Sequence, residues 1–271
     1  MARMGATPFA LPDFTGATRR LVLVNLVSFF VLLLAQLADK SLYAWISIHC
    51  VMVPQAFLDG WLWQPLTYSL VHLTLVGTLF ELLSLWFLAS FLEAGRGSTW
   101  VTGLYAVSVL GTALAAVALY VVGDKMGFPI EQIPLYGCMG GIFGMLIAVG
   151  MLFGDVQFLL FFTIAVKARY MAAIYALITF AMLFGQNRLA AFAQLGGAVA
   201  GILYIRLAPR RGFAFQVSER MYGVRNAWYR WKRRRAARKF EVYMRKQGRT
   251  VRLDSRGRQI DEDPDDKSRW N

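Results

Sequence analysis

Apolar residues run in long unbroken blocks along the chain as far as Leu207. Several blocks carry no charged residue for about twenty positions, the length at which a helix spans a bilayer. The alternation of apolar and polar residues that marks barrel strands does not occur in these blocks. Only helices and closed barrels satisfy every backbone group in lipid. The pattern therefore predicts an all-α, polytopic membrane protein.

The blocks predict six membrane-spanning helices. They cover Leu21–Leu37, Leu66–Phe91, Thr99–Val122, Tyr136–Phe153, Tyr170–Phe184 and Leu189–Leu207. One further apolar piece, Val156–Val166, is too short for another crossing. It is either a re-entrant or interfacial segment or an extension of a neighbouring helix, and the pattern leaves both open.

Lysine and arginine in the short loops indicate the orientation. Six crossings put both termini on one side of the membrane. That side carries Arg3, Arg19, Arg20, Arg96, Lys167, Arg169 and the basic C-terminal tail, and the other carries Lys40, Lys125 and Arg188. Because basic residues are concentrated in cytoplasmic loops, we expect both termini in the cytoplasm.

Composition separates the chain into three parts. The formal net charge is +13, and nearly all of it comes from residues after Leu207. We expect a cytoplasmic N-terminal segment over 1–20, a six-helix membrane domain over 21–207 and a basic cytoplasmic tail over 208–271. With only two cysteines, Cys50 and Cys138, the chain has too few for a disulfide framework.

The tail has helix-forming composition over Phe213–Gln247 and ends in an acidic segment, Asp261–Asp266, which we expect to be disordered. Its basic cluster includes Arg233, Arg234, Arg235, Arg238 and Lys239. Basic residues near a membrane surface are attracted to anionic lipid. We therefore expect the tail to contact anionic lipid or a cytoplasmic protein. Nucleic acid or the ribosome is a less favoured partner, since no nucleic-acid motif is present.

Two glycine-rich segments resemble the active-site segments of the rhomboid family of intramembrane serine proteases. Residues 137–144, Gly-Cys-Met-Gly-Gly-Ile-Phe-Gly, are similar to the rhomboid Gly-x-Ser-Gly-x-x-x-Gly. Residues 193–197, Ala-Gln-Leu-Gly-Gly, followed by Gly201, are similar to its Ala-His-Leu-Gly-Gly segment. Weaker matches at 63–72, 92–98 and 161–169 follow in the family's order, and the last of them resembles bacterial members.

The resemblance implies a rhomboid-like six-helix bundle with its catalytic positions substituted. Met139 stands at the position of the nucleophilic serine and Gln194 at that of the base histidine. Gly77 and Glu81 stand where the family stabilises the oxyanion. Methionine has no ionisable nucleophile and an amide does not accept a proton near neutral pH. We therefore expect no serine-protease catalysis.

The resemblance, with its catalytic positions substituted, implies a rhomboid pseudoprotease of the bacterial cytoplasmic membrane. We expect such a protein to bind transmembrane segments of client proteins. Glu81, Met139 and Gln194 would line the client-binding cavity, with a hydrogen bond between Glu81 and Gln194. The helices would pack through small residues that let backbones approach. These are Gly137, Gly140, Gly144, Gly197 and Gly201.

Two other functions stay open. The first is an active endopeptidase, either serine-type or with a displaced Cys138–His72 pair. The second is a membrane scaffold that acts through its basic tail. We expect no metal and no cofactor under any of these hypotheses.

Overall fold

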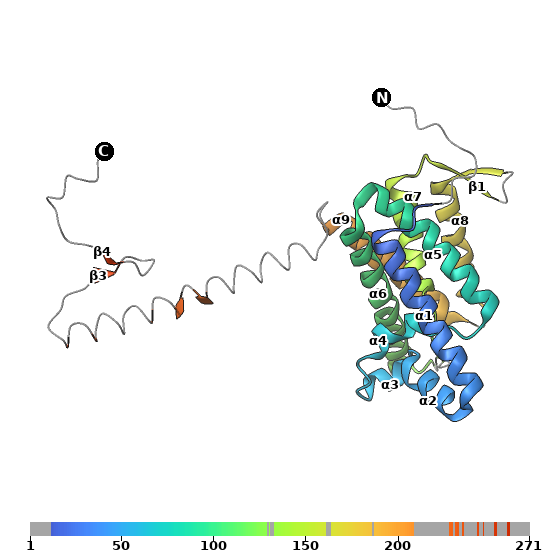
Figure 1. Ribbon diagram of the computed structural model, residues 1–271. Coiled ribbons are helices and arrows are strands. Elements are labelled where there is room, and N and C mark those ends of the chain that lie inside the picture. The colour runs from blue at the N-terminus through green and yellow to red at the C-terminus, as the bar shows by residue number, and fades with distance from the viewer. Residues whose placement is uncertain are drawn as a thin grey trace. The chain divides into compact units, whose positions relative to one another are not determined.

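The computed structural model describes residues 12–208 apart from 129, 131–132, 161–163 and 186, together with a few positions of the C-terminal tail between 228 and 260. The chain divides into two compact units, Met1–Phe213 and Ala214–Asn271. The first unit is a bundle of apolar helices (Figure 1). Most of the predicted tail helix and the whole acidic segment lie outside the described residues.

The first unit contains nearly all of the regular structure among the described residues. In chain order its elements are α1 (Gly16–Ala38), α2 (Lys40–Cys50), α3 (Pro54–Leu58), α4 (Gln64–Thr67), the 3-10 turn η1 (Tyr68–Leu70), α5 (Leu75–Arg96), α6 (Ser98–Lys125), α7 (Met139–Leu152), β1 (Gln157–Leu160), β2 (Ile164–Lys167), α8 (Ala168–Met182) and α9 (Arg188–Leu207). The second unit has the short strands β3 (Arg252–Leu253) and β4 (Gln259–Ile260), which pair antiparallel.

Four of the described helices, α1, α5, α6 and α9, are long and apolar enough to cross a membrane. The prediction of a mostly helical, multi-pass membrane protein is therefore confirmed. The other two expected spans correspond to α7 and α8, which are apolar but have only 14 and 15 residues. That is shorter than the roughly 20 residues that a full crossing requires.

The sequence analysis was wrong in two places about local structure. The second span does not run unbroken from Leu66. The chain forms α4 and η1, is extended at Val71 and Thr74, and only then enters α5 at Leu75. The piece at Val156–Val166 is not a helical extension, because β1 and β2 pair there as an antiparallel hairpin. The alternative of a re-entrant or interfacial segment stays a prediction. The chain is thus not wholly α-helical.

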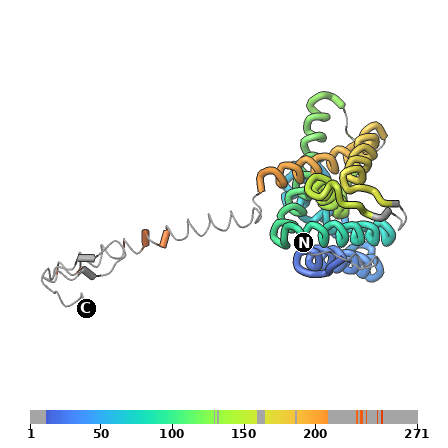
Figure 2. Tube along the Cα trace, turned by 90° about the horizontal axis from the view of Figure 1, so that it is seen from above, coloured from blue at the N-terminus to red at the C-terminus, as the bar shows by residue number. Residues whose placement is uncertain are grey.

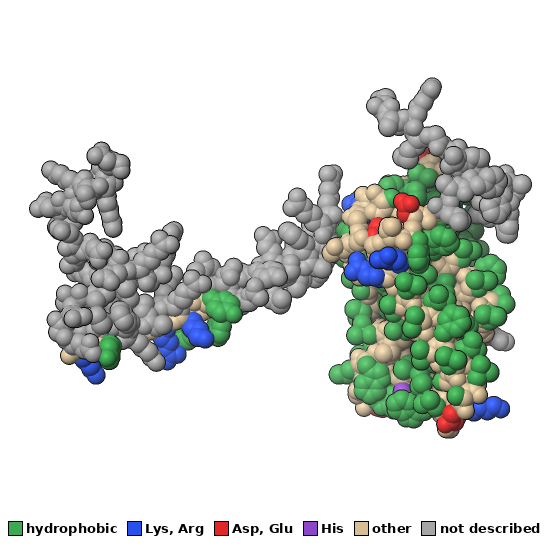
Figure 3. Space-filling model, in the orientation of Figure 1, with side chains coloured by type: hydrophobic (Ala, Val, Ile, Leu, Met, Phe, Trp, Pro, Cys, Tyr) green, Lys and Arg blue, Asp and Glu red, His purple; other side chains and the backbone are tan. Residues whose placement is uncertain are grey.

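Hydrophobic side chains cover most of the visible face of the bundle, and charged side chains gather toward its two ends (Figure 3). Seen from above, α7 lies in the middle, with α1 on one side and α8 and α9 on the other (Figure 2). Helices α5, α6, α8 and α9 all pack against α7. The N-terminal end of α7 is therefore enclosed by protein.

The tight turn between α1 and α2 is capped by Asp39, whose carboxylate accepts hydrogen bonds from the backbone N–H and the hydroxyl of Ser41, both at 2.7 Å. The Ser41 hydroxyl and backbone hydrogen bonds hold the pKa of Asp39 below its usual range. An acidic N-cap of this kind satisfies one of the free N–H groups of the helix. It marks the point where α1 ends and α2 begins.

Candidate functional site

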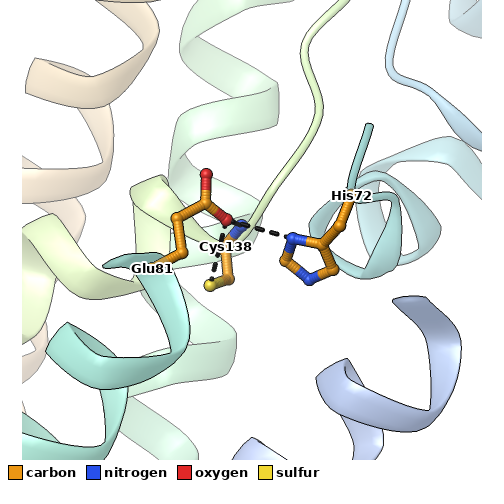
Figure 4. Close-up of side chains that lie close together, drawn as sticks. All are labelled: His72, Glu81 and Cys138. Carbon is orange, nitrogen blue, oxygen red and sulfur yellow. Dashed lines mark hydrogen bonds and ion pairs between the residues drawn. The ribbon is translucent and has the colours of Figure 1, made fainter. Parts of the chain in front are cut away.

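Three side chains that are far apart in the sequence meet at the N-terminal end of α7 (Figure 4). Glu81 projects from α5, His72 from the extended segment before it, and Cys138 is the N-cap residue of α7. Glu81 Oε2 lies 3.1 Å from His72 Nδ1 and 3.5 Å from Cys138 Sγ. We call these three residues the His–Glu–Cys cluster.

The imidazole of His72 is held from its other side by Asn25 of α1. His72 Nε2 lies 3.1 Å from Asn25 Oδ1. The amide Nδ2 of Asn25 donates to the carbonyl of Leu21 at 2.8 Å, so Oδ1 is left as the acceptor and Nε2 of His72 is the donor. This arrangement directs Nδ1 of His72 at Glu81, and both ring nitrogens have a partner.

The Glu81 carboxylate lies against the turn that starts α7. The backbone N–H of Cys138 donates to Glu81 Oε2 at 3.1 Å. Gly137, just before it, has a φ of 83°, and a Cβ there would lie 2.7 Å from Glu81 Oε1. Only glycine combines this backbone conformation with so close an approach. An anionic group at a helix N-terminus is also favoured by the helix dipole.

The cluster is enclosed. Cys138 is fully buried and His72 is 4% exposed, while the side chain of Glu81 is 18% exposed. The Tyr68 carbonyl accepts the backbone N–H of Gly137 at 3.0 Å, and the Tyr68 hydroxyl donates to the Val109 carbonyl of α6 at 2.8 Å. The turn before α7 is therefore fixed by hydrogen bonds on both of its sides.

Chemically, the cluster is poorly arranged for nucleophilic catalysis. The Cys138 thiol is oriented toward the carboxylate of Glu81 and not toward the imidazole of His72. Removing its proton would place a thiolate beside that carboxylate, and the imidazole has no free nitrogen to accept the proton. Cys138 and His72, the displaced pair of the hypothesis, are thus close together, but the Glu81 carboxylate lies between them and contacts both.

The donor atoms of the cluster are also those of a metal site. The ligand atoms of His72, Glu81 and Cys138 all lie within 4.8 Å of one another. An imidazole nitrogen, a carboxylate oxygen and a thiol sulfur are the three ligand types that zinc takes in proteins.

The expected hydrogen bond between Glu81 and Gln194 does not form. In the described part of the chain, Glu81 interacts with His72 and Cys138, and no hydrogen bond involves the Gln194 side chain. The prediction was wrong because the Glu81 side chain, which projects from α5, reaches the N-terminal end of α7. There the backbone N–H of Cys138 and the imidazole of His72 contact its carboxylate. Gln194 is half-buried on α9, and Gly77 is half-buried in the first turn of α5.

Met139 is the first residue of α7, next to Cys138, and its half-buried side chain packs against the core. The position that resembles the rhomboid nucleophile thus lies one residue from the His–Glu–Cys cluster.

The glycines expected at helix contacts lie where α6, α7 and α9 approach one another. A Cβ on Gly197 would lie 2.1 Å from Thr112 Oγ1 and 3.2 Å from the Gly140 carbonyl. One on Gly201 would lie 3.1 Å from the Gly144 Cα. These distances leave no room for a side chain, so the absence of Cβ atoms lets the backbones meet. Gly137 instead serves the turn at Glu81.

Of the predicted basic cluster in the tail, Arg235 is described, and Arg233, Arg234, Arg238 and Lys239 lie outside the described residues. The Arg235 guanidinium lies 5.3 Å from the Trp231 ring centroid, and Lys232 Nζ lies 5.3 Å from that of Trp228. Both pairs have the four-residue spacing of one helix face.

Residues 19–212 match the family described as "Eukaryotic integral membrane protein (DUF1751)". The match covers α1 through α9, which is well over half of the chain. The chain belongs to this family. No curated protein matches it significantly.

The DUF1751 family is one of integral membrane proteins whose function is not known, and the family match supports a location in the lipid bilayer. Because the family is described as eukaryotic, it does not support the bacterial cytoplasmic membrane expected from the segment at 161–169. The DUF1751 match ends at residue 212, so the basic tail lies outside it.

The sequence analysis missed Asn25 and Tyr68 as parts of the site. One signal was available for Asn25, since it is a polar residue inside an apolar span and such residues face the interior of a bundle by default. The partner of a buried polar residue is set by helix packing, and nothing in the local sequence gave it.

Proposed function

We propose that this DUF1751 protein is a rhomboid-like membrane protein with six crossings that binds transmembrane segments of client proteins without cleaving them. Both termini lie in the cytoplasm under this proposal. The observation that carries it is the state of the substituted site: Met139 begins α7 with no ionisable group, and the thiol of Cys138 beside it is engaged by Glu81.

The two short helices are compatible with six crossings. Non-helical backbone is tolerated at membrane depth where protein buries it. The chain just before α7 meets this condition, because Leu135 pairs with Met52 through two backbone hydrogen bonds of 2.9 Å and Gly137 donates to Tyr68. Helix α7 can therefore begin inside the membrane, after a segment whose backbone is hydrogen-bonded to Met52 and Tyr68.

Under this proposal, a client helix approaches the bundle from the side of α5 and α8. Helices α5 and α8 both pack against α7 but share few contacts with each other. Each presents large exposed apolar side chains, such as Phe80 and Phe87 on α5 and Ile174 and Ile178 on α8. Under this proposal, an apolar client helix packs against these exposed side chains of α5 and α8.

A photo-crosslinking experiment tests client binding. A photoreactive residue replaces Met139 in one variant and Leu114 in the other. Leu114 is a matched control because it is 56% exposed on the span α6. Irradiation of native membranes should join discrete membrane proteins to the Met139 variant and only a diffuse background to the Leu114 variant. Equal patterns from both positions would refute the proposal.

A cleavage assay tests the alternative of an active peptidase. Purified protein is incubated with labelled transmembrane substrates, and the Cys138→Ala and Met139→Ala variants are run in parallel. We expect no cleavage product from any of the three proteins. Cleavage that is lost in Cys138→Ala and retained in Met139→Ala would establish a cysteine peptidase and overturn the proposal.

For the tail we propose contact with anionic lipid. The exposed Trp228 and Trp231 rings each carry a basic side chain above them, and aromatic residues beside basic ones suit the interface of a membrane. A tail peptide over 208–271 should bind vesicles that contain phosphatidylserine and not vesicles of phosphatidylcholine alone. Binding to both equally would argue against an electrostatic attraction.

A further inference from the structure

We propose that the His–Glu–Cys cluster binds one zinc ion, through His72 Nδ1, a Glu81 carboxylate oxygen and Cys138 Sγ. The ion would connect α5, the extended segment before it and the start of α7. This inference does not depend on client binding, and nothing in the family description assigns a metal.

The spacing of the donor atoms carries the proposal. Tetrahedral zinc with its usual bond lengths separates neighbouring ligand atoms by about 3.3–3.7 Å. Glu81 Oε2 already lies 3.1 Å from His72 Nδ1 and 3.5 Å from Cys138 Sγ. The remaining separation, from Nδ1 to Sγ, is at most 4.8 Å. A small rotation of the Cys138 side chain would shorten the distance from Sγ to Nδ1 to the value that a zinc ion requires.

The second ring nitrogen of His72 has the kind of hydrogen-bond partner that is common behind metal-binding histidines. A metal-binding histidine donates its other ring N–H to an oxygen, which sets the tautomer and the direction of the ring. His72 Nε2 has such a partner in Asn25 Oδ1 at 3.1 Å. The Asn25 amide is itself held by the Leu21 carbonyl. Nδ1 is therefore the nitrogen that would bind the metal, once it has lost the proton that it shares with Glu81.

A second and independent observation comes from Tyr105 of α6. This residue is 7% exposed, and its hydroxyl is buried without a hydrogen-bond partner among the described residues. Cys138 lies near it, and the side chains of Asn25 and Ser69 are close enough to affect it. A buried polar group without a hydrogen bond of good geometry is costly. A zinc ion with three protein ligands has a fourth position, and a water there would be a further partner for a buried hydroxyl near Cys138.

The net charge of the proposed site is also consistent with a zinc ion in the membrane. A zinc ion bound by one carboxylate, one thiolate and a neutral imidazole has no net charge, which suits a site at membrane depth. Binding releases two protons to solvent, one from the thiol and one shared by His72 and Glu81. A cavity of about 240 Å³ between α1, α2 and the start of α5 is lined by Gln36, Tyr43 and His72, among others. Of the three proposed ligands, it borders His72.

The test uses the full chain, purified in detergent without a histidine tag, stripped with chelator and titrated with Zn²⁺ and then with Co²⁺. The sequence offers matched controls, since it has only two cysteines and two histidines. We expect one equivalent of metal per chain and a thiolate-to-cobalt charge-transfer band. Both should persist in Cys50→Ser and His49→Gln. The band should disappear in Cys138→Ser, and His72→Gln should bind at least tenfold more weakly.

Asn25→Ala tests the support of the ligand, and it should lower zinc affinity by about 10- to 100-fold. If the ligand variants do not fold, the Cys50→Ser protein still decides the test. Its only thiol is Cys138, so a thiolate band in that protein must come from Cys138. A folded Cys50→Ser protein that binds less than a tenth of an equivalent, or that shows no thiolate band, overturns the proposal. So does a folded Cys138→Ser protein with unchanged affinity.

Discussion

The carboxylate of Glu93, at the end of α5, binds the first turn of α1. It accepts hydrogen bonds from the backbone N–H of Ala17 at 2.8 Å and of Thr18 at 2.9 Å, and from the Thr18 hydroxyl at 2.6 Å. The Ser98 hydroxyl donates to the same carboxylate. One side chain thus caps a helix that begins more than seventy residues earlier and joins two spans at one end of the bundle.

Replacement of Glu93 by alanine should therefore destabilise the protein by about 2–4 kcal/mol, because charge-assisted bonds are lost and the N–H groups of α1 are left without a partner. Thermal unfolding in detergent measures the effect. Glu93→Gln retains the shape and one acceptor oxygen and should cost less. A Glu93→Gln protein that unfolds at the same temperature as the unchanged chain would show that the charge is not what matters.

Gly137→Ala should destabilise the protein more than Gly127→Ala. Both glycines have positive φ, 83° and 71°, but a Cβ on Gly137 meets the Glu81 carboxylate and one on Gly127 meets nothing within 4 Å. The control should lose about 1 kcal/mol for its backbone conformation. Gly137→Ala should lose about 2–4 kcal/mol, since the carboxylate must also move away from α7. Equal losses, measured by thermal unfolding, would show that Glu81 yields without cost.

The contact between α6, α7 and α9 should be sensitive to a single methyl group. In Gly197→Ala the new Cβ would lie 2.1 Å from Thr112 Oγ1, whereas in Gly185→Ala the nearest atom is at 3.4 Å. Overpacking costs about 1–3 kcal/mol, so Gly197→Ala should unfold at a lower temperature and Gly185→Ala should be close to neutral. A neutral Gly197→Ala would mean that the helices can separate slightly.

Cysteine labelling distinguishes six crossings from four. Single cysteines at Ser41, Thr99, Val156 and Asn187 are introduced into the Cys50→Ser protein, in which Cys138 is buried. With six crossings, an impermeant maleimide should reach Thr99→Cys and Val156→Cys only from the cytoplasmic side of sealed vesicles, and the other two only from the opposite side. With four crossings, Val156→Cys would be labelled together with Ser41→Cys.

The spans were predictable because the signal for them is local. Hydrophobicity over about twenty residues decides whether a helix is stable in lipid, and no knowledge of its neighbours is needed. The expected spans at Leu21–Leu37 and Thr99–Val122 accordingly lie within α1 and α6. The same reasoning failed at Val156–Val166, where a hairpin and a helix have the same apolar composition.

The polar site was not predictable in the same way. Glu81 was recognised as a buried carboxylate that needs a partner, yet Gln194 was the wrong one. Cys138 lies 57 positions from Glu81 and Asn25 lies 47 from His72. Which of several buried polar groups meet depends on how the helices are rotated and on where α7 begins.

By itself, the sequence determined that the chain is a helical, multi-pass membrane protein with a charged tail. Lipid selects for apolar length, and nearly all of the net positive charge lies after Leu207. Only the tertiary structure decided that Glu81 joins His72 and Cys138 and that Glu93 holds the start of α1. A carboxylate in an apolar bundle goes to whichever donors the packing brings within about 3 Å, and that depends on the arrangement of whole helices.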